Sequence, residues 1–475
     1  MIPFDWRLIA VEAAASVWIL VLLVADMLMP PARRRNLWLL AFAGILVCLT
    51  LLFWQQQTFL EGSAQEMLVV DAFSLFFKGL FLLTGLLVII MTRESGLALN
   101  ESPGPFYLLL FTALLGALVL ASVNDLLMLF IGLELLTFSL YIMAAYLKRD
   151  ARSVEAGMKY LIMGSVSSGF LVFGIALLYG FAGATSFPQV SHAIFLAPKT
   201  PSIYAGLFLV LAGLGFKVAA VPFHLWVPDV YEGAPAPVVA FLSVGSKMAG
   251  MVALMRVLYG VFLPLVATWS NLLAWVAAAT ILYGNLGALP QTNFKRLLGY
   301  SSIGHAGYLL MGISSAGWSG VTAVGYYLLA YMLSNLAVFL VLIAASGALG
   351  GETLDDFKGL GKRSGLLAAV MFIGLLSLAG VPPLAGFVGK LLILLSAAER
   401  NRLWLVAIGA VNVAISLYYY LMIVKRMYLD PPRSASPIPI TPLTKTALIV
   451  LVLGILAVGI CQEPFLQRIS TALPY

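Results

Sequence analysis

The sequence predicts an all-α polytopic membrane protein with about fourteen membrane-spanning helices. Hydrophobic residues make up 62% of the 475 residues and charged residues only 10%, whereas soluble domains are about 25% charged. Apolar runs of about 18 residues or more recur along the whole chain, and a helix of that length crosses a hydrocarbon core about 30 Å thick. This composition excludes a soluble enzyme or a soluble binding module.

Turn residues and charges mark the ends of the predicted spans. In order, the spans cover residues 7–29, 37–54, 72–92, 105–121, 124–147, 155–181, 203–226, 235–260, 270–290, 297–314, 320–348, 366–395, 402–428 and 442–463. We expect the first run to be a retained helix, because it lacks a basic leader and a small-residue cleavage site. The segments between spans are too short to enclose a nucleotide or a flavin, so any redox cofactor is expected in other chains. Cys48 and Cys461 lie in separate apolar runs without a CxxC pattern, which predicts neither a metal centre nor a disulfide.

Lysine and arginine are unevenly distributed between the two sides of the predicted bundle. The loops after odd-numbered spans hold most of them, beginning with Arg33, Arg34 and Arg35. The other side holds only a few, which are Arg7, Lys199, Arg400, Arg402 and Arg468. Basic loops stay in the cytoplasm, so both termini are expected outside. The net charge of +7 therefore reflects topology, and no nucleic-acid partner is expected.

Two prolines interrupt spans that resemble each other. The stretch "AAVPFHLW" in the seventh span is matched by "AGVPPLAGF" in the twelfth, which places Pro222 against Pro382. A proline inside a helix removes a hydrogen bond and clashes with the preceding turn, so both helices should be discontinuous. Because the two spans lie five positions apart in the order of spans, an odd number, they cross the membrane in opposite directions, and the second copy would be inverted, as in many transporters. Two unrelated proline kinks are the alternative.

Four ionisable residues lie deep within predicted spans. Glu134 and Lys247 fall near the middle of their spans, Lys217 slightly past the middle, and Lys390 soon after the Pro382 break. A charge at the centre of a membrane helix costs about 2.5–3.5 kcal/mol, so these residues indicate polar surroundings and an ion or proton path. Glu134 is the expected partner of one of the lysines. The alternative is a structural ion pair that only fixes helix packing.

Other polar residues give weaker signals. His305, in "YSSIGHAGY", is expected to relay protons. His224 follows Pro222 and either relays a proton or bonds backbone carbonyls freed by the break. Lys159 and Lys78 lie near the ends of their spans, where they either join the pathway or extend toward the membrane surface.

Three motifs carry a resemblance to a known family. "LGFKVAAVPFHLWVPDVYEGAPAPVVAFLSVGSKMAG", "QTNFKRLLGYSSIGHAGY" and "LAGVPPLAGFVGK" closely resemble the antiporter-like membrane subunits of proton-pumping NADH:quinone oxidoreductase, respiratory complex I. The motif "VPDVYEGAPAP" and the presence of lysine at position 390 favour the N-type subunit, called NADH dehydrogenase subunit 2 in mitochondria. The M-type sister would be expected to have a glutamate there and a different loop.

The resemblance implies a fold and a set of site residues. It implies fourteen helices, with N-terminal helices in 1–104, a first repeat in 105–260, an inverted repeat in 270–428 and a last helix in 429–475. It implies that Glu134 pairs with Lys217, that Lys247 is central, that Lys390 faces the outer half-channel and that His305 lies on the connecting axis. The acidic cytoplasmic loop with Asp229 and Glu232 departs from the positive-inside pattern.

The resemblance also implies a function and partners. The chain would be a proton-translocating subunit of a translocase in the bacterial inner membrane, without a redox centre of its own. NAD, FMN, iron-sulfur clusters and quinone would be bound by partner subunits, and M-type and K/J/A-type membrane-arm subunits would be its neighbours in the lipid bilayer. The alternatives are a subunit of a multi-subunit cation/proton (Na⁺/H⁺) antiporter, or of a related ferredoxin- or F420-linked dehydrogenase or membrane hydrogenase. A passive scaffold would tolerate neutralisation of Lys247.

Overall fold

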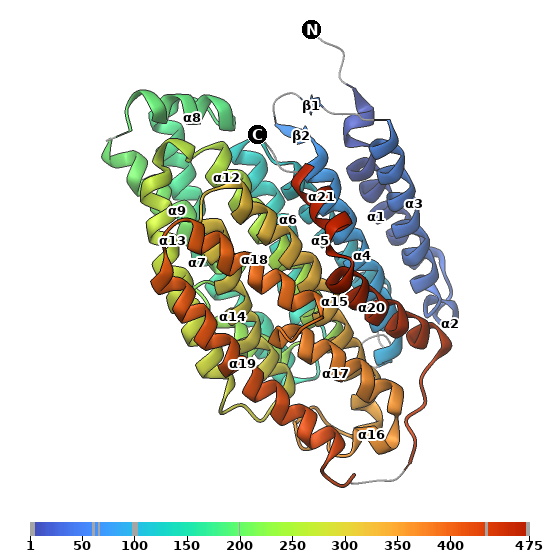
Figure 1. The fold of residues 1–475 in the computed structure, drawn as a ribbon. Helices are drawn as coiled ribbons and strands as arrows, with labels where there is room; N and C mark the ends of the chain where they lie inside the picture. Colours follow the sequence, from blue (N-terminus) through green and yellow to red (C-terminus); the bar gives the residue numbers. More distant parts are fainter. Residues whose placement is uncertain are drawn as a thin grey trace.

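The computed structural model describes residues 5–58, 62–64, 67–96, 103–198, 200–432 and 436–471. Long helices run roughly side by side, and α1 begins at the end of the bundle where α21 ends (Figure 1). The elements in chain order are η1 (Trp6–Ile9), α1 (Ala10–Leu28), α2 (Pro31–Arg34), α3 (Leu37–Gln57), β1 (Gly62–Ala64), β2 (Leu68–Val70), α4 (Ala72–Ser95), α5 (Pro103–Ser122), α6 (Leu126–Ala144), α7 (Ala151–Ala182), α8 (Phe187–Leu196), α9 (Pro201–Val218), α10 (Trp226–Gly233), α11 (Ala236–Phe241), η2 (Leu242–Ser246), α12 (Lys247–Gly260), η3 (Leu263–Leu265), α13 (Val266–Ala288), α14 (Phe294–Ser314), α15 (Trp318–Leu349), α16 (Leu360–Arg363), α17 (Gly365–Ala379), α18 (Ala385–Glu399), α19 (Leu403–Tyr428), α20 (Pro442–Ile460) and α21 (Gln462–Thr471).

The helices confirm a polytopic membrane protein. In the part of the chain that the structure describes, 12 helical segments are long and apolar enough to cross a membrane. Two further predicted spans also have counterparts. The tenth is α14, which has 21 residues but carries many buried polar side chains, and the twelfth is divided between α17 and α18.

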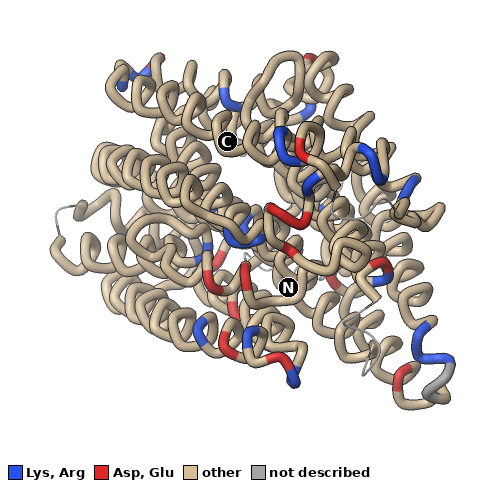
Figure 2. The backbone as a smooth tube through the Cα atoms, turned by 90° about the horizontal axis from the view of Figure 1, so that it is seen from below, with Lys and Arg blue, Asp and Glu red and all other residues tan. Residues whose placement is uncertain are grey.

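Burial separates central helices from peripheral ones. The segment α11–α12 is buried throughout its most apolar stretch, and α15, with 32 residues, is nearly as enclosed. The helices α1, α3, α7 and α19 instead expose many large apolar side chains. We expect these side chains to face lipid, because the hydrocarbon core of a membrane contains no water and apolar side chains can be exposed to it. Charged residues are correspondingly sparse over the whole bundle (Figure 2).

Small residues allow the closest helix contacts. A Cβ atom added to Gly284 of α13 would lie 2.2 Å from the backbone nitrogen of Gly304 on α14. Only glycine allows two backbones to approach so closely, as is common between membrane helices. This contact holds α14, which carries His305, firmly against α13.

Both predicted helix interruptions are confirmed. The helix α9 ends at Val218, and the chain becomes helical again at Trp226, while α17 ends at Ala379 and α18 begins at Ala385. The residue that follows α9 and the residue that follows α17 both have a left-handed backbone conformation, Ala219 with φ 63° and Gly380 with φ 89°. Counted from these two residues, Pro222 corresponds to Pro383, so the predicted pairing of Pro222 with Pro382 is displaced by one residue.

Two small elements lie in segments that the sequence analysis left as loops. The strands β1 and β2 pair antiparallel, with Ser63 opposite Val69. The helix α8 packs at one end of the bundle beside α7 and α12 (Figure 1). Neither element reaches the interior of the bundle.

Candidate functional site

Four ionisable side chains are buried in the middle of the bundle. Lys217 on α9, Lys247 on α12, His305 on α14 and Lys390 on α18 are each at most 4% exposed. A buried polar or charged group is costly unless other groups satisfy it, so the partners of these residues define the site.

Glu134 and Lys217 lie at one end of the site. Ser168 on α7 donates a hydrogen bond to Glu134 Oε1 on α6. Lys217 Nζ donates to Thr137 Oγ1 at 2.9 Å and to Tyr160 Oη at 3.4 Å. The direct pairing of Glu134 with Lys217 that the resemblance implies is not formed here, because Lys217 Nζ bonds the two hydroxyl groups instead.

The side chain of Lys217 also contacts the helix that carries Lys247. A Cβ atom added to Gly250 of α12 would lie 3.0 Å from Lys217 Cγ, so the lysine packs on this glycine. Tyr160, which accepts the bond from Lys217, also interacts with the side chain of Ser246. Ser246 directly precedes Lys247, so a single tyrosine connects the surroundings of the two lysines.

Lys247 is bound to Ser302 on α14. Its Nζ donates to both the carbonyl oxygen and the hydroxyl of Ser302. That hydroxyl also forms hydrogen bonds of 3.1 Å with Tyr231 Oη and with Tyr331 Oη. The lysine follows the π-helical turn η2, a type of local widening that is frequent at functional sites.

His305 continues the row one helical turn after Ser302. Its Nδ1 lies 2.6 Å from Tyr327 Oη, and its Nε2 lies 3.2 Å from Tyr420 Oη. Tyr420 also shares a hydrogen bond with Ser301. Each ring nitrogen therefore has a hydroxyl partner that can both donate and accept a proton.

Lys390 lies at the second helix break. Its Nζ donates a 2.9 Å bond to the carbonyl oxygen of Ala379, the last residue of α17, and lies 5.1 Å from the centre of the Tyr308 ring. The break frees this carbonyl from its helix, so the lysine satisfies a group that would otherwise be orphaned. At the first break, Trp226 Nε1 donates at 3.1 Å to Phe216 O, which also accepts a bond from the backbone N–H of Ala219.

Two of the weaker candidates are placed differently. His224 is buried in the first break, where its ring lies against Tyr283 with 4.1 Å between the ring centres. Neither ring nitrogen makes a hydrogen bond of normal geometry, although the carbonyl group of Pro222 lies near. Lys159 is half-exposed and pairs with Asp229 and Glu155, each at 2.8 Å. The structure thus brings Lys159 into a surface ion-pair cluster and leaves it outside the buried row.

The side chain of Lys78 does not extend toward the membrane surface, which was one of its two predicted positions. Its side chain is fully buried, and its Nζ lies 2.7 Å from Glu12 Oε1 on α1. Glu12 lies in the first turn of an otherwise apolar helix, so the sequence pattern alone does not indicate this pair.

The sequence analysis also missed the hydroxyl groups that connect the ionisable residues. They are Thr137, Tyr160, Ser168, Tyr231, Tyr327, Tyr331 and Tyr420. Hydroxyl side chains are common in membrane helices, so no single one is distinctive. A useful signal is their position: Thr137 lies one turn from Glu134, and Ser302 one turn from His305.

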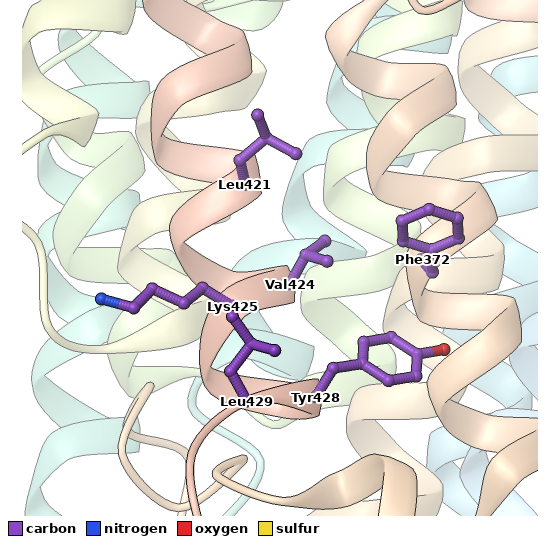
Figure 3. Close-up of a pocket in the computed structure, with 6 residues that line it drawn as sticks. All are labelled: Phe372, Leu421, Val424, Lys425, Tyr428 and Leu429. Atoms are coloured by element: carbon purple, nitrogen blue, oxygen red, sulfur yellow. The ribbon is translucent and has the colours of Figure 1, made fainter.

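No metal centre is evident among the described residues. No group of three or more His, Cys, Asp or Glu side chains could hold a metal ion there. Cys48 is buried and Cys461 exposed, and both are free thiols. An apolar groove of about 470 Å³ between α17 and α19 is separate from the buried row, and the amine of Lys425 points away from it (Figure 3).

Discontinuous helices and a buried row of lysines, histidine and hydroxyl groups define a polytopic membrane protein of the ion-translocating class. The profile of the NADH:quinone oxidoreductase/Mrp antiporter transmembrane family matches residues 123–416. The chain belongs to this family, which confirms the resemblance seen in its motifs.

Individual relatives agree with this assignment. The NADH-quinone oxidoreductase subunit N of Moorella thermoacetica is 41% identical over 459 residues, which cover 96% of each chain. A chain of respiratory complex I from Thermus thermophilus with bound aureothin is 31% identical with a TM-score of 0.82, covering 98% of this chain and 100% of that chain. A chain of the Mrp complex from Dietzia sp. DQ12-45-1b has a TM-score of 0.86 at 22% identity, covering 98% and 97%, and shows the fold alone.

Proposed function

We propose that this protein is a proton-translocating membrane-arm subunit of an NADH:quinone oxidoreductase and contains no redox centre itself. The observation that carries the proposal is the row of proton-exchanging groups that begins at the half-buried Glu134 and continues through the buried residues from Lys217 to Lys390. Full-length relatives that are named as subunits of this enzyme support the choice of complex.

Each lysine in the row has neighbours suited to proton exchange. A buried lysine can exist in protonated and neutral forms, whereas an arginine stays protonated. We assign proton loading to Glu134 and Lys217, central storage to Lys247, relay to His305 and release to Lys390. Hydroxyls of Thr137, Tyr160, Ser302 and Tyr327 contact these groups, and each can donate one hydrogen bond while accepting another.

Two other candidates receive smaller roles. His224 has buried ring nitrogens without normal hydrogen bonds, so it would join the path only if water entered the first break. Lys159 would hold the cytoplasmic ends of α7, α10 and α14 together through Asp229 and Arg296.

The division of the chain into two inverted repeats is part of the proposal. Residues 105–260 and 270–428 would each contain one discontinuous helix, with 1–104 and 429–475 outside the repeats. The similar endings of α9 and α17 at Ala219 and Gly380 support this division. Inversion gives each repeat a half-channel that opens toward a different side.

The partners and the location follow from the same proposal. NAD, FMN, iron-sulfur clusters and quinone would be bound by other subunits, and M-type and K/J/A-type subunits would flank this chain. The complex would lie in a bacterial inner membrane with both termini of this chain outside, as the distribution of basic loops indicates.

The experiment isolates the complex through a tag on this chain and reconstitutes it in vesicles. NADH-driven quinone reduction accompanied by proton uptake supports the proposal. A complex without electron transfer that exchanges Na⁺ for protons along an imposed gradient would instead identify an antiporter. Electron transfer from ferredoxin or F420 but not from NADH would identify a related dehydrogenase.

A further inference from the structure

A cavity of about 700 Å³ opens at one end of the bundle, away from the buried row of proton-exchanging groups. It lies where α13 begins, where α14 ends and where α18 connects to α19. Its lining includes Ser270, Trp275, Arg400, Arg402 and Trp404. The volume lies within the range of about 300–1,000 Å³ that is usual for small-molecule sites.

Two arginines in this cavity have only neutral partners among the described residues. Arg402 donates to Ser314 O at 2.7 Å, to Ser270 Oγ at 2.6 Å and to Asn271 Oδ1 at 3.1 Å. Arg400 donates to Ala316 O at 2.9 Å. The adjacent acid, Glu399, accepts a bond from Ser319 instead.

Among the described residues no acid forms an ion pair with either arginine, so the two positive charges repel each other. Burial lowers the pKa of Arg402 from its usual value, and the charge of Arg400 lowers it further. The bonds to Ser314 and Ser270 fix the Arg402 side chain at the wall of the cavity. An anion at this place would relieve the repulsion between the guanidinium groups.

The mouth of the cavity has the character of a membrane interface. Trp275 and Trp404 stack with 4.4 Å between ring centres and are 67% and 38% exposed. The neighbouring side chains of Leu263 and Leu403 are also exposed. Tryptophan is enriched where headgroups meet hydrocarbon, so both charged and apolar parts of a lipid can reach this site.

We propose that this cavity binds an anionic phospholipid, with its phosphate on Arg400 and Arg402 and its glycerol and first acyl carbons against the tryptophan pair. Guanidinium groups match phosphate oxygens in geometry as well as in charge. The exposed apolar rim favours a lipid over free phosphate, because free phosphate would leave that rim uncovered. The bound lipid would seal the ends of α13, α14 and α19 together.

The test uses the assembled complex, washed in detergent and incubated with phosphatidylglycerol or phosphatidylcholine in micelles. Retained lipid is counted by mass spectrometry after gel filtration. The wild type should retain about one phosphatidylglycerol per complex more than the Arg400→Gln/Arg402→Gln double variant, and phosphatidylcholine should show a smaller difference. Excess inorganic phosphate should leave most of this lipid bound.

Arg468→Gln is the matched control, because Arg468 is an exposed arginine on α21 outside the cavity. It should retain lipid like the wild type. If the double variant fails to assemble, Arg400→Gln alone, which removes a single bond to a backbone carbonyl, should weaken retention at least twofold. Equal retention by wild type and variants overturns the proposal. So does complete displacement by inorganic phosphate, or a cross-link that places a carboxylate of a neighbouring subunit on the two arginines.

Discussion

Lys217 Nζ donates a 2.9 Å hydrogen bond to Thr137 Oγ1, and Thr137 lies one turn from Glu134 on α6. That hydroxyl donates its own hydrogen to the carbonyl oxygen of Leu133, so the lysine binds a threonine on the helix of Glu134 and not the carboxylate itself. In this arrangement Glu134 is bound by Ser168 and Lys217 is held toward Tyr160 and α12.

Replacing Thr137 with Val should slow proton translocation several-fold, whereas Thr137→Ser should stay close to wild type. Valine keeps the shape but removes the acceptor, which leaves a buried amine short of a bond at a cost of about 1–3 kcal/mol. Proton uptake by vesicles containing the reconstituted complex measures the effect. Equal rates for the Val and Ser variants would show that the hydroxyl has no part in the path.

Gly380→Ala should destabilise the second helix break by about 1–2 kcal/mol, because Gly380 has φ 89° and an L-residue is strained there. The added Cβ would also lie 3.0 Å from Lys390 Cδ and would displace that side chain. Gly347→Ala is the control, since nothing lies within 4 Å of the added atom on α15. Thermal dissociation of the complex measures both variants, and an unchanged midpoint for Gly380→Ala would contradict the strain.

Glu12→Gln should destabilise the complex by about 3–5 kcal/mol, because it leaves the buried Lys78 without its charge partner. The double variant Glu12→Gln/Lys78→Met removes both charges and should recover most of the loss. Thermal dissociation measures stability, and proton pumping by the double variant should stay near wild type. Failure of the double variant to pump would place this ion pair in the proton path.

The ion pairs around Asp229 at the surface predict that the stability of the complex falls at acidic pH. Burial raises the pKa of Asp229, but hydrogen bonds from Lys159 and Arg296 outweigh burial and hold it below its usual value. A carboxyl with a lowered folded-state pKa stabilises the fold above about pH 4 and loses this contribution as the pH falls through the folded pKa. Asp229→Asn should therefore lower the dissociation temperature near pH 7 and differ less from wild type below about pH 4. Glu155→Gln, at a more exposed partner of Lys159, should have a smaller effect, and a constant Asp229→Asn difference at all pH values would refute this account.

The sequence predicted the helix breaks and the buried lysines because both conflict with an apolar membrane helix. A proline or an amine in such a helix carries a large cost, so Pro222, Lys217 and Lys247 are conspicuous in a single sequence. The one-residue displacement from Pro382 to Pro383 arose because two adjacent prolines are equivalent by type and differ only in their distance from Gly380.

The partners of the buried residues could not be predicted in the same way. Thr137 and Ser302 are unremarkable by type, and only their bonds to Lys217 and Lys247 on other helices give them a role. Lys78 was misjudged because its distance from the span end permits it to reach the surface, whereas α1 places Glu12 beside it. Such pairings depend on contacts between distant segments, which periodicity and spacing do not encode.

Lys247 carries a translocated proton in this mechanism, and the number of protons translocated per electron by the reconstituted Lys247→Met complex measures that role. Methionine keeps a similar length but cannot bind a proton, so the complex should assemble and this ratio should fall, with slower electron transfer if coupling is tight. Lys247→Arg should fail as well, because arginine does not release its proton at working pH. Glu134→Gln should be milder or comparable, since it leaves Lys247 able to titrate. A Lys247→Met complex that assembles and keeps the wild-type ratio and rate would show that Lys247 carries no translocated proton.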